Sequence, residues 1–254
     1  MEYGLIGEKL GHSYSKEIHE LLADYTYDLC PVAIKDFSQF MTAHDFRAIN
    51  VTIPYKQDVI PYLDEIDSHA KAIGAVNTIV NKNGRLEGHN TDFSGFLYML
   101  QKHNIPITGR KCLVLGNGGA AKAVTAVLHH LDAEQVLTVS RRITPDTITY
   151  EECLGHHTDA AVIVNTTPVG MYPNHDASPL NLAPFSSCES VIDVIYNPLE
   201  TKLTEQAKEL GMTAITGLEM LVAQALYAAE FFLDTKLDET QIDSIYQKLA
   251  AGKQ

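Results

Sequence analysis

Three small residues, Gly116, Gly118 and Ala121, have the spacing of a turn that binds a dinucleotide. They follow the apolar run Cys112–Leu115, which suits a buried parallel strand, and they fit the pattern G-x-G-x-x-G/A that opens a helix. The first glycine allows a sharp turn, the second lets backbone N–H groups approach a pyrophosphate, and the third small residue lets the helix pack on its strand. Because the helix N-terminus adds partial positive charge, we expect a dinucleotide here.

The residues after this turn favour NADP over NAD. Ala120–Leu131 predicts a helix and Gln135–Val139 a second strand, which completes a βαβ unit. An NAD site usually carries an acidic residue about 20 positions after the glycines. Here the strand is followed instead by Ser140, Arg141 and Arg142, and two guanidinium groups suit a 2′-phosphate. The alternative is that the arginine pair is a solvated loop end.

Further polar stretches lie where an α/β core would not need them. Ser13 and Ser15 precede a predicted helix and suit a carboxylate, but local sequence alone favours the simpler interpretation, in which Ser15 is an N-cap and Ser13 a loop residue. The stretch Asn50–Lys56 places a lysine beyond a strand end, where parallel sheets bind ligands, although lone lysines are usually solvated. Gly74–Thr78 and Gly88–Asp92 add amides and a carboxylate, or only turn and N-cap chemistry.

The elements that must position these residues indicate an α/β protein. Strands expected at Tyr3–Ile6, Tyr27–Ala33 and Ala48–Ile53 alternate with helices from Ser15 to about Tyr25 and near Phe37–His44. This alternation predicts a parallel sheet. We then expect helices from Pro54 to about Leu63 and over Asp67–Ile73, a hairpin of Asn77–Asn81 and Leu86–Asn90 around Asn83-Gly84, and a helix over Asp92–His103.

The second half of the chain continues the α/β pattern. We expect strands at Ala160–Asn165, Ser190–Ile195 and Met212–Ile215, and helices at Thr201–Leu210, Leu218–Leu233 and Glu239–Leu249. Nothing regular is predicted between Arg142 and Ala160, where His156-His157 is interpreted as solvated loop. The last two helices have no strand after them, so we expect them to return to the first domain.

Composition excludes several classes of partner. The 254 residues are 45% hydrophobic and carry a formal net charge of −13, which argues against nucleic acid and anionic membranes. The four widely spaced cysteines suggest neither disulfides nor a zinc site. The N-terminus lacks the features of a signal peptide, and the apolar Ile215–Leu233 carries Glu219, Gln224 and Glu230, so it is expected to be a core helix. We expect a cytoplasmic monomer or homodimer that acts on a small molecule.

The polar stretches also carry a family resemblance along nearly the whole chain. Eight motifs of the shikimate dehydrogenase family occur here in the family's order. They are H-S-x-S at 12–15, N-V-T-x-P-x-K at 50–56, G-A-x-N-T at 74–78, G-x-N-T-D at 88–92, G-x-G-G-A at 116–120, N-x-T-x-x-G-M at 165–171, D-x-x-Y-N-P at 193–198 and G-x-x-M-L-x-x-Q-A at 217–225. Eight motifs in one order are specific, so the chain is similar to that family.

The resemblance implies an NADP-dependent oxidoreductase that interconverts 3-dehydroshikimate and shikimate in aromatic amino acid biosynthesis. Residues 1–91 with 218–254 would form a mainly parallel α/β substrate-binding domain, and 92–217 a Rossmann-like NADP-binding domain, with the site in a cleft between them. The implied substrate residues are Ser13, Ser15, Thr52, Lys56, Asn77, Asp92, Tyr196 and Gln224. The implied cofactor residues are Gly116, Asn117, Gly118, Gly119, Ala120, Ser140, Arg141, Arg142, Thr166, Gly217 and Met220. No metal is implied.

Lys56 and Asp92 match the family's catalytic pair. Hydride reduction of a ketone develops alkoxide character, so a cationic donor beside the oxygen stabilises the transition state and delivers the proton. We therefore expect Lys56 to act as the general acid in reduction and as the base in oxidation. Asp92 would be its coupled partner, so that the two groups titrate as a pair.

Four alternatives remain open, of which the last has the least support. A relative acting on quinate is one, although serines at both 13 and 15 fit shikimate better. Some NAD use is another, because the family's N-R-T-x-x-R clamp keeps Arg141 while its second arginine has moved to 142. A catalytically silent NADP-binding regulatory module is the third, and it would not need both Lys56 and Asp92. A reductase for another cyclic substrate on the same fold has less support.

Overall fold

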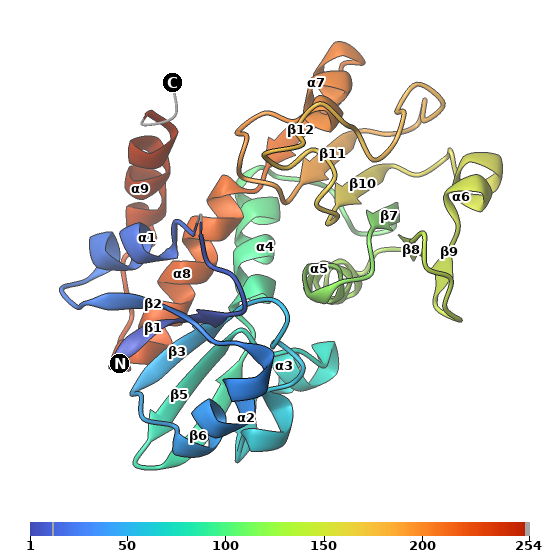
Figure 1. The fold of residues 1–254 in the computed structure, drawn as a ribbon. Helices are drawn as coiled ribbons and strands as arrows, with labels where there is room; N and C mark the ends of the chain where they lie inside the picture. Colours follow the sequence, from blue (N-terminus) through green and yellow to red (C-terminus); the bar gives the residue numbers. More distant parts are fainter. Residues whose placement is uncertain (12, 252–254) are drawn as a thin grey trace. The chain divides into compact units, whose positions relative to one another are not determined.

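The computed structural model describes residues 1–11 and 13–251, and its backbone divides into two compact units (Figure 1). The first unit comprises Met1–Gly95 and Val222–Leu249, and the second Phe96–Leu221 with Ala250 and Ala251. Each unit is built on one six-stranded sheet. The chain passes from one unit to the other within α4 (Thr91–Lys102), within α8 (Leu218–Leu233) and near the end of α9 (Thr240–Ala251).

The sheet of the first unit has the strand order β2-β1-β3-β5-β6-β4. Its strands are β1 (Tyr3–Gly7), β2 (Tyr27–Pro31), β3 (Ala48–Val51), β4 (Glu65–Ile66), β5 (Thr78–Lys82) and β6 (Arg85–His89). The prediction of parallel β1, β2 and β3 is confirmed, whereas β5 runs antiparallel to both β3 and β6. The predicted hairpin joins β5 to β6 through Asn83 and Gly84, whose φ angles of 57° and 89° suit the favoured Asn-Gly turn.

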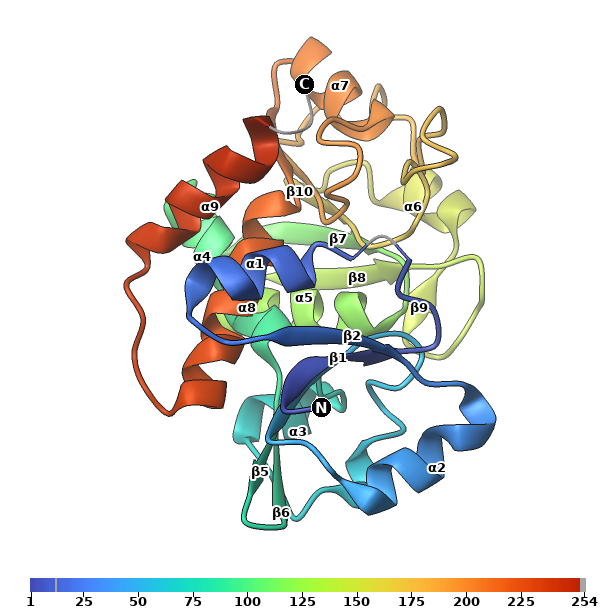
Figure 2. The ribbon, with the colours of Figure 1, turned by 60° about the vertical axis from the view of Figure 1, so that its left-hand side comes forward.

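Helices cover both faces of this sheet (Figures 1 and 2). They are α1 (Ser15–Leu22), α2 (Ile34–Ala43), the short 3₁₀ helix η1 (Ile60–Tyr62), α3 (Ser68–Ile73) and the C-terminal part of α8, and most of α9 (Thr240–Ala251) belongs to the same unit. Successive strand residues face opposite sides, so Ile6 of β1 packs in one cluster with Phe37 of α2. Leu5 packs in another cluster with Phe232 of α8. The sheet is therefore buried between two helical layers.

The sheet of the second unit is parallel throughout and has the order β12-β11-β10-β7-β8-β9. Its strands are β7 (Lys111–Leu115), β8 (Gln135–Val139), β9 (Thr147–Ile148), β10 (Val162–Asn165), β11 (Ser190–Asp193) and β12 (Thr213–Thr216). Its helices are α5 (Gly119–His130), α6 (Tyr150–His156) and α7 (Lys202–Glu209). If β7 to β12 are numbered 1 to 6, the sheet read from β9 has the strand order 3-2-1-4-5-6, which is that of the Rossmann fold. This order confirms the predicted fold class.

The core of the second unit explains its layers. Leu113 and Ile163 of the sheet form one cluster with Cys153 of α6 and Leu203 of α7. Helix α5 packs against β7 and β8 and buries its own apolar stripe.

In the described part of the chain, no helix combines the length and the apolar character that a bilayer crossing requires.

The helix predicted from Pro54 to about Leu63 is wrong. This segment forms turns that end in η1 and β4. A helix would need the carbonyl of Lys56 for a bond within the segment, but that carbonyl accepts from the N–H of Val76 at 2.8 Å. Pro61 also has no N–H to donate. The hydrogen bond to Val76, which lies twenty residues further along the chain, thus replaces a helical hydrogen bond of Lys56.

Other boundaries also differ from expectation. Helix α1 ends at Leu22 and not near Tyr25, because Ala23 is extended. Strand β9 and helix α6 occupy the stretch after Arg142 in which no element was predicted. The helix begins with a capping box in which Thr149 and Glu152 satisfy each other's backbone N–H groups. His156, interpreted as solvated loop, is the last residue of that helix.

Candidate functional site

The polar stretches of the first unit leave one edge of its sheet. Strands β1 and β3 are parallel neighbours that end at Gly7 and Val51, and the loops after them lead to Ser13 and to Thr52. The start of β5 pairs with the end of β6, because Thr78 lies opposite His89. Asn77 and Asp92 flank this pairing, so sequence segments far apart in the chain converge on the same edge.

Lys56 and Asp92 form an ion pair at this edge. Lys56 Nζ lies 2.5 Å from Asp92 Oδ2, and the two side chains are only 17% and 11% exposed. The main chain of Lys56 is held by the bond from Val76 to its carbonyl. Asp92 lies in the first turn of α4, near the positive end of the helix dipole. A half-buried ammonium beside a fixed carboxylate can donate a proton to a reacting oxygen and recover it.

Asn77 holds the other oxygen of the Asp92 carboxylate. Its Nδ2 donates to Asp92 Oδ1 at 3.0 Å and to Thr91 Oγ1 at the same distance. Its Oδ1 accepts from the N–H of Thr91 at 2.7 Å, so the amide orientation is fixed by the main chain. Asp92 is not the N-cap of α4, since Asn90 Oδ1 accepts from the N–H of Phe93 at 3.3 Å. The carboxylate is therefore available for Lys56.

The serine pair lies at the start of α1, but the predicted capping role of Ser15 is wrong. Ser15 is the first helical residue, and its own N–H is accepted by the Ser13 hydroxyl at 3.2 Å. Both serines are partly exposed. His12 of the same motif lies outside the described residues. The Ser13 hydroxyl and the helix N-terminus together offer donors for a carboxylate.

Thr52 and Gln224 are two further predicted site residues of the first unit. Thr52 follows β3 directly, and its N–H donates to the carbonyl of Ile6 at 2.9 Å. Its side chain lies against Gly7, where an added Cβ would meet Thr52 Cγ2 at 2.6 Å. Gln224 lies in α8 and is partly exposed. Both side chains are partly exposed at the surface of the unit.

In the second unit, the glycine turn sits at the carboxyl end of β7. Gly116 has φ of 106°, and an added Cβ would lie 2.8 Å from Thr166 Oγ1 of the loop after β10. Only glycine combines that backbone angle with so close an approach. Gly118 is the N-cap residue of α5 and has no side chain to cover the helix N–H groups, which leaves them open to an anion. Asn117, Gly119 and Ala120 complete the turn, and none of them is buried.

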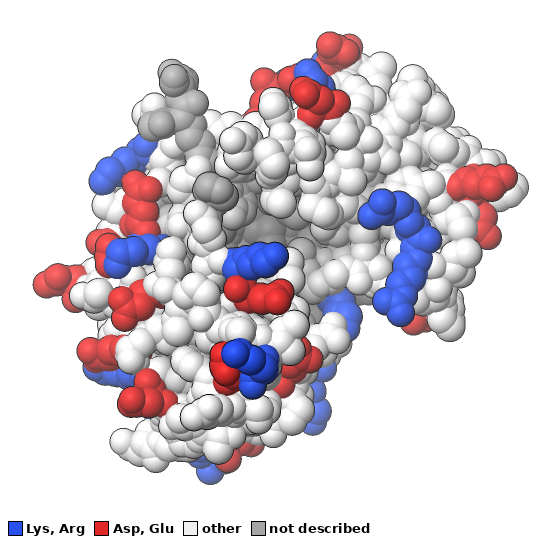
Figure 3. Space-filling model, in the orientation of Figure 1, with Lys and Arg blue, Asp and Glu red and all other residues white. Residues whose placement is uncertain are grey.

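Ser140, Arg141 and Arg142 follow β8, the strand next to the glycine turn. Both arginines are exposed, and the Ser140 hydroxyl accepts from the N–H of Arg142 at 3.1 Å. Figure 3 shows basic side chains gathered over the part of the second unit where β8, β9 and α5 lie. Elsewhere on the same face, acidic and basic side chains are interspersed. This concentration of positive charge suits a phosphate group.

Asp193 orders the loops that follow β10 and β11. It is fully buried and accepts hydrogen bonds from Asn165 Nδ2 at 3.0 Å, the Thr201 hydroxyl at 2.8 Å and the N–H of Ile195 at 3.1 Å. Burial raises the pKa of its carboxyl to about 6, and the three donors oppose that rise. The loop after β11 carries Tyr196, which is partly exposed. Asp193 therefore fixes the backbone around two predicted site positions, Thr166 and Tyr196.

Gly217 and Met220 lie where β12 leads into α8. An added Cβ at Gly217 would lie 2.0 Å from the carbonyl oxygen of Val194, so the two backbones are in direct contact. Met220 is buried in the first turn of α8. In the same turn, Glu219 accepts from Lys102 Nζ at 2.7 Å and lies 2.6 Å from His103 Nε2. These contacts fix the start of α8 on the second unit.

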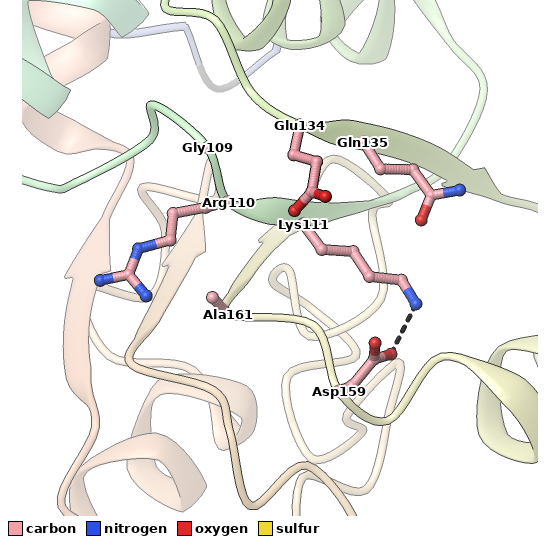
Figure 4. A pocket seen from close by; sticks show the side chains of 7 residues that line it. All are labelled: Gly109, Arg110, Lys111, Glu134, Gln135, Asp159 and Ala161. Atoms are coloured by element: carbon pink, nitrogen blue, oxygen red, sulfur yellow. Dashed lines mark hydrogen bonds and ion pairs between the residues drawn. The ribbon is translucent and has the colours of Figure 1, made fainter.

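A cavity of about 540 Å³ lies at the opposite edge of the second sheet (Figure 4). It is lined by Gly109, Arg110, Lys111, Glu134, Gln135, Asp159 and Ala161. Lys111 and Gln135 begin β7 and β8, whereas Gly116 follows the end of β7. The Lys111 ammonium is paired with Asp159 at 2.5 Å. The hollow is thus separate from the glycine turn, and its lysine is already neutralised.

Sequence reasoning assigned no role to several buried polar residues of the first unit. Tyr27, Asn50 and Thr78 form hydrogen bonds that lead to Asn77. Asn50 carries a weak signal, because it is an amide in the apolar strand Ala48–Val51. In the described residues, no three His, Cys, Asp or Glu side chains gather in a way that would hold a metal ion.

Comparisons with known proteins agree across the chain. Residues 5–79 match the family model described as the shikimate dehydrogenase substrate binding domain. A curated protein of Clostridium beijerinckii, named shikimate dehydrogenase (NADP(+)), is 40% identical, with 96% of each chain covered. The chorismate mutase/shikimate 5-dehydrogenase fusion protein of Clostridium acetobutylicum superposes with a TM-score of 0.91 at 38% identity, covering 98% of this chain and 97% of that one. The shikimate 5-dehydrogenase of Thermus thermophilus, solved with NADP(H) and shikimate, gives 0.85 at 29% identity, covering 98% and 99%.

Proposed function

Because the chain belongs to the shikimate dehydrogenase family, we propose that Lys56 and Asp92 are the proton-transfer pair with which it acts on its substrate. The chain is an NADP-dependent oxidoreductase that acts on a CH–OH group. The reaction is the reversible NADPH-dependent reduction of 3-dehydroshikimate to shikimate. The single observation that carries the catalytic assignment is the 2.5 Å contact between Lys56 Nζ and Asp92 Oδ2.

The chemistry follows from that contact. When hydride from NADPH reaches the ketone carbon, negative charge develops on the carbonyl oxygen. The Lys56 ammonium would stabilise that charge and transfer its proton to the oxygen, which yields the alcohol. In the reverse direction the amine of Lys56 takes the hydroxyl proton. Asp92, held by Asn77 through its second oxygen, keeps the lysine ammonium in one orientation.

The substrate carboxylate would be bound by Ser13 and Ser15 at the start of α1. The ring hydroxyls would be held by Thr52, Lys56, Asn77, Asp92 and Gln224, and Tyr196 is a further proposed substrate residue. Support comes from the first sheet, where the segments carrying Thr52, Asn77 and Asp92 leave the same edge. Hydroxyl, amide and carboxylate groups supply both donors and acceptors, as a polyhydroxylated ring requires.

The cofactor would be bound by the carboxyl edge of the second sheet. The glycine turn at 116–120 would hold the pyrophosphate, and Ser140, Arg141 and Arg142 the 2′-phosphate. Thr166 follows β10, Gly217 follows β12 and Met220 lies in the first turn of α8, and these residues would contact the rest of the cofactor. When bound, the cofactor would supply the hydride as NADPH and accept it as NADP in the reverse direction, while the side chains of this chain bind and orient the substrate and move the proton.

We place this activity in the cytoplasm, and sedimentation velocity would distinguish a monomer from a homodimer.

The test is NADPH formation at 340 nm, with shikimate or quinate and with NADP or NAD. We expect shikimate with NADP to give the highest kcat/KM. Lys56→Ala should lower kcat by about 10²- to 10⁴-fold while KM changes far less, because the lost group acts in the transition state. Lys82→Ala is the matched control: its ammonium pairs with Glu87 at 2.7 Å in the same unit but is 54% exposed.

Each outcome separates the alternatives. An unchanged kcat in Lys56→Ala would refute the catalytic assignment and leave the family assignment intact. Higher kcat/KM with quinate, or with NAD, would favour the relative with relaxed specificity. NADP binding without turnover of any pair would favour the silent regulatory module.

A further inference from the structure

A chain of buried hydrogen-bond donors in the first unit ends at the carboxylate of Asp92. It begins at Tyr27 of β2, whose hydroxyl donates to Asn50 Oδ1 at 2.7 Å. Asn50 Nδ2 donates to Thr78 Oγ1 at 3.0 Å, and the Thr78 hydroxyl, which accepts this bond, donates to Asn77 Oδ1 at 3.0 Å. Asn77 Nδ2 then donates to Asp92 Oδ1 at 3.0 Å. We call Tyr27, Asn50, Thr78 and Asn77 the donor row.

Main-chain groups fix the direction of the row. The carbonyl of Asn77 can only accept, so the Asn50 atom 3.2 Å from it is Nδ2, which leaves Oδ1 facing the Tyr27 hydroxyl. The N–H of Thr91 can only donate, so the Asn77 atom 2.7 Å from it is Oδ1. Nδ2 of Asn77 therefore faces Asp92. Reversal of either amide would break a main-chain bond.

The row is shielded from water along its whole length. Tyr27 and Thr78 are 0% exposed, and Asn77 and Asn50 are 3% and 5% exposed. Burial raises the pKa of the Tyr27 hydroxyl well above its usual range, so the hydroxyl stays a donor. His19 stacks on the Tyr27 ring at 4.0 Å, and burial lowers its pKa to about 3, so it brings no charge. In such surroundings, successive hydrogen bonds polarise and strengthen one another.

We propose that Tyr27, Asn50 and Thr78 are positioning residues for the Lys56–Asp92 pair. The row holds the Asn77 amide on one carboxylate oxygen, Oδ1, and so leaves Oδ2 for the lysine ammonium. The carboxylate cannot rotate without losing the bond from Asn77, so Lys56 keeps one orientation through the reaction. This inference rests on the proposed function of Lys56 and Asp92, but Tyr27, Asn50 and Thr78 belong to none of the substrate or cofactor contacts proposed above.

The first test compares two tyrosines in the same part of the unit. Tyr27→Phe removes the hydroxyl that begins the row. Tyr25→Phe is the matched control, because its hydroxyl bonds His19 Nδ1 at 2.6 Å and lies outside the row. With shikimate and NADP, we expect kcat of Tyr27→Phe to fall by about 5-fold, the equivalent of one neutral hydrogen bond. KM for NADP should be unchanged, and Tyr25→Phe should keep the wild-type kcat.

The second test replaces the middle of the row and does not depend on how Tyr27→Phe folds. Thr78→Val keeps the shape but loses the hydroxyl, so kcat should fall by about 5-fold or more. Thr78→Ser keeps the hydroxyl and should restore most of the loss, which a packing role alone would not do. Wild-type kcat in both Tyr27→Phe and Thr78→Val would overturn the positioning role alone. Absence of turnover in the wild type would overturn the proposed function as well.

Discussion

Gly217 joins β12 to α8 at a point where two backbones touch. A Cβ added there would lie 2.0 Å from the carbonyl oxygen and 2.4 Å from the carbonyl carbon of Val194, both of them main-chain atoms that cannot rotate away. The N–H of Gly217 donates to the carbonyl of Ile195 at 2.9 Å, which holds the two segments together. To reach an ordinary 3.4 Å contact, Gly217→Ala must separate them by about 1.4 Å.

We expect this separation to reduce both stability and cofactor binding. Overpacking of this kind costs about 1–3 kcal/mol, so the free energy of unfolding should fall by that amount. Met220 lies in the helical turn that begins after Gly217, so KM for NADP should rise and kcat should fall, because small displacements at reacting groups are costly. Gly155→Ala is the control within the same unit. Gly155 lies inside α6 with open space around it. Alanine at this position should raise the free energy of unfolding by about 0.5–1 kcal/mol.

Urea unfolding followed by far-UV circular dichroism would give both free energies, and the 340 nm assay would give both kinetic constants. The free energy of unfolding is thus expected to fall in Gly217→Ala and to rise in Gly155→Ala, although both changes replace glycine by alanine in the same unit. If Gly217→Ala matched the wild type in stability and in KM for NADP, the backbone contact with Val194 would not constrain the start of α8. If Gly155→Ala destabilised the protein as strongly as Gly217→Ala, the reasoning from added Cβ atoms would be wrong.

Two further predictions concern Asp193 and the arginine pair. The pKa of Asp193 is raised from 3.8 to about 6 in the folded protein, which therefore binds more protons than the unfolded chain between these values, so this group loses about 3 kcal/mol of stabilisation as pH rises through that window. Asp193→Asn should lack this slope, and identical pH dependence of urea unfolding in both proteins would contradict the assignment. Arg141→Ala should raise KM for NADP about 10-fold or more, by loss of a charge-assisted bond to phosphate, and leave KM for NAD nearly unchanged. An equal effect on both cofactors would show that Arg141 does not contact the 2′-phosphate.

Local sequence signals were sufficient wherever one segment determines its own structure. The glycine turn at 116–121 needs a strand before it and a helix after it, and β7, α5 and β8 follow within one or two residues of expectation. The pair Asn83-Gly84 specifies a turn by its own backbone preference, so the hairpin was also predicted. The capping box of Thr149 and Glu152 is also a local sequence signal, but the seven-residue helix α6 that follows it is too short to show a clear apolar periodicity.

Predictions were wrong where a distant segment competes for backbone groups. The carbonyl of Lys56 bonds Val76, twenty positions away, and no local pattern shows that a helix there would leave Val76 without its acceptor. At α1, serine at position 15 is a residue type favoured at N-caps, but the backbone already takes helical angles at Tyr14, one residue earlier. The Ser13 hydroxyl then accepts the N–H of Ser15 itself, and among the described residues the Ser15 side chain caps no helix N–H. The residue types were therefore predicted correctly, but their geometry was decided by hydrogen bonds to other residues, twenty positions away for Lys56 and two positions away for Ser15.

The donor row extends this reasoning to the site itself. Motif matching selects Asn77 and Asp92, because residue types at fixed spacing are visible in one segment. Tyr27 and Asn50 come from strands on either side of β1, and the row exists only because β3 pairs with β5 in the register that sets Asn50 opposite Thr78. A shift of one residue would turn the Asn50 side chain to the other face of the sheet and leave a buried amide without partners. The orientation of the Asp92 carboxylate therefore depends on strand register, which the sequence pattern of the site residues does not contain.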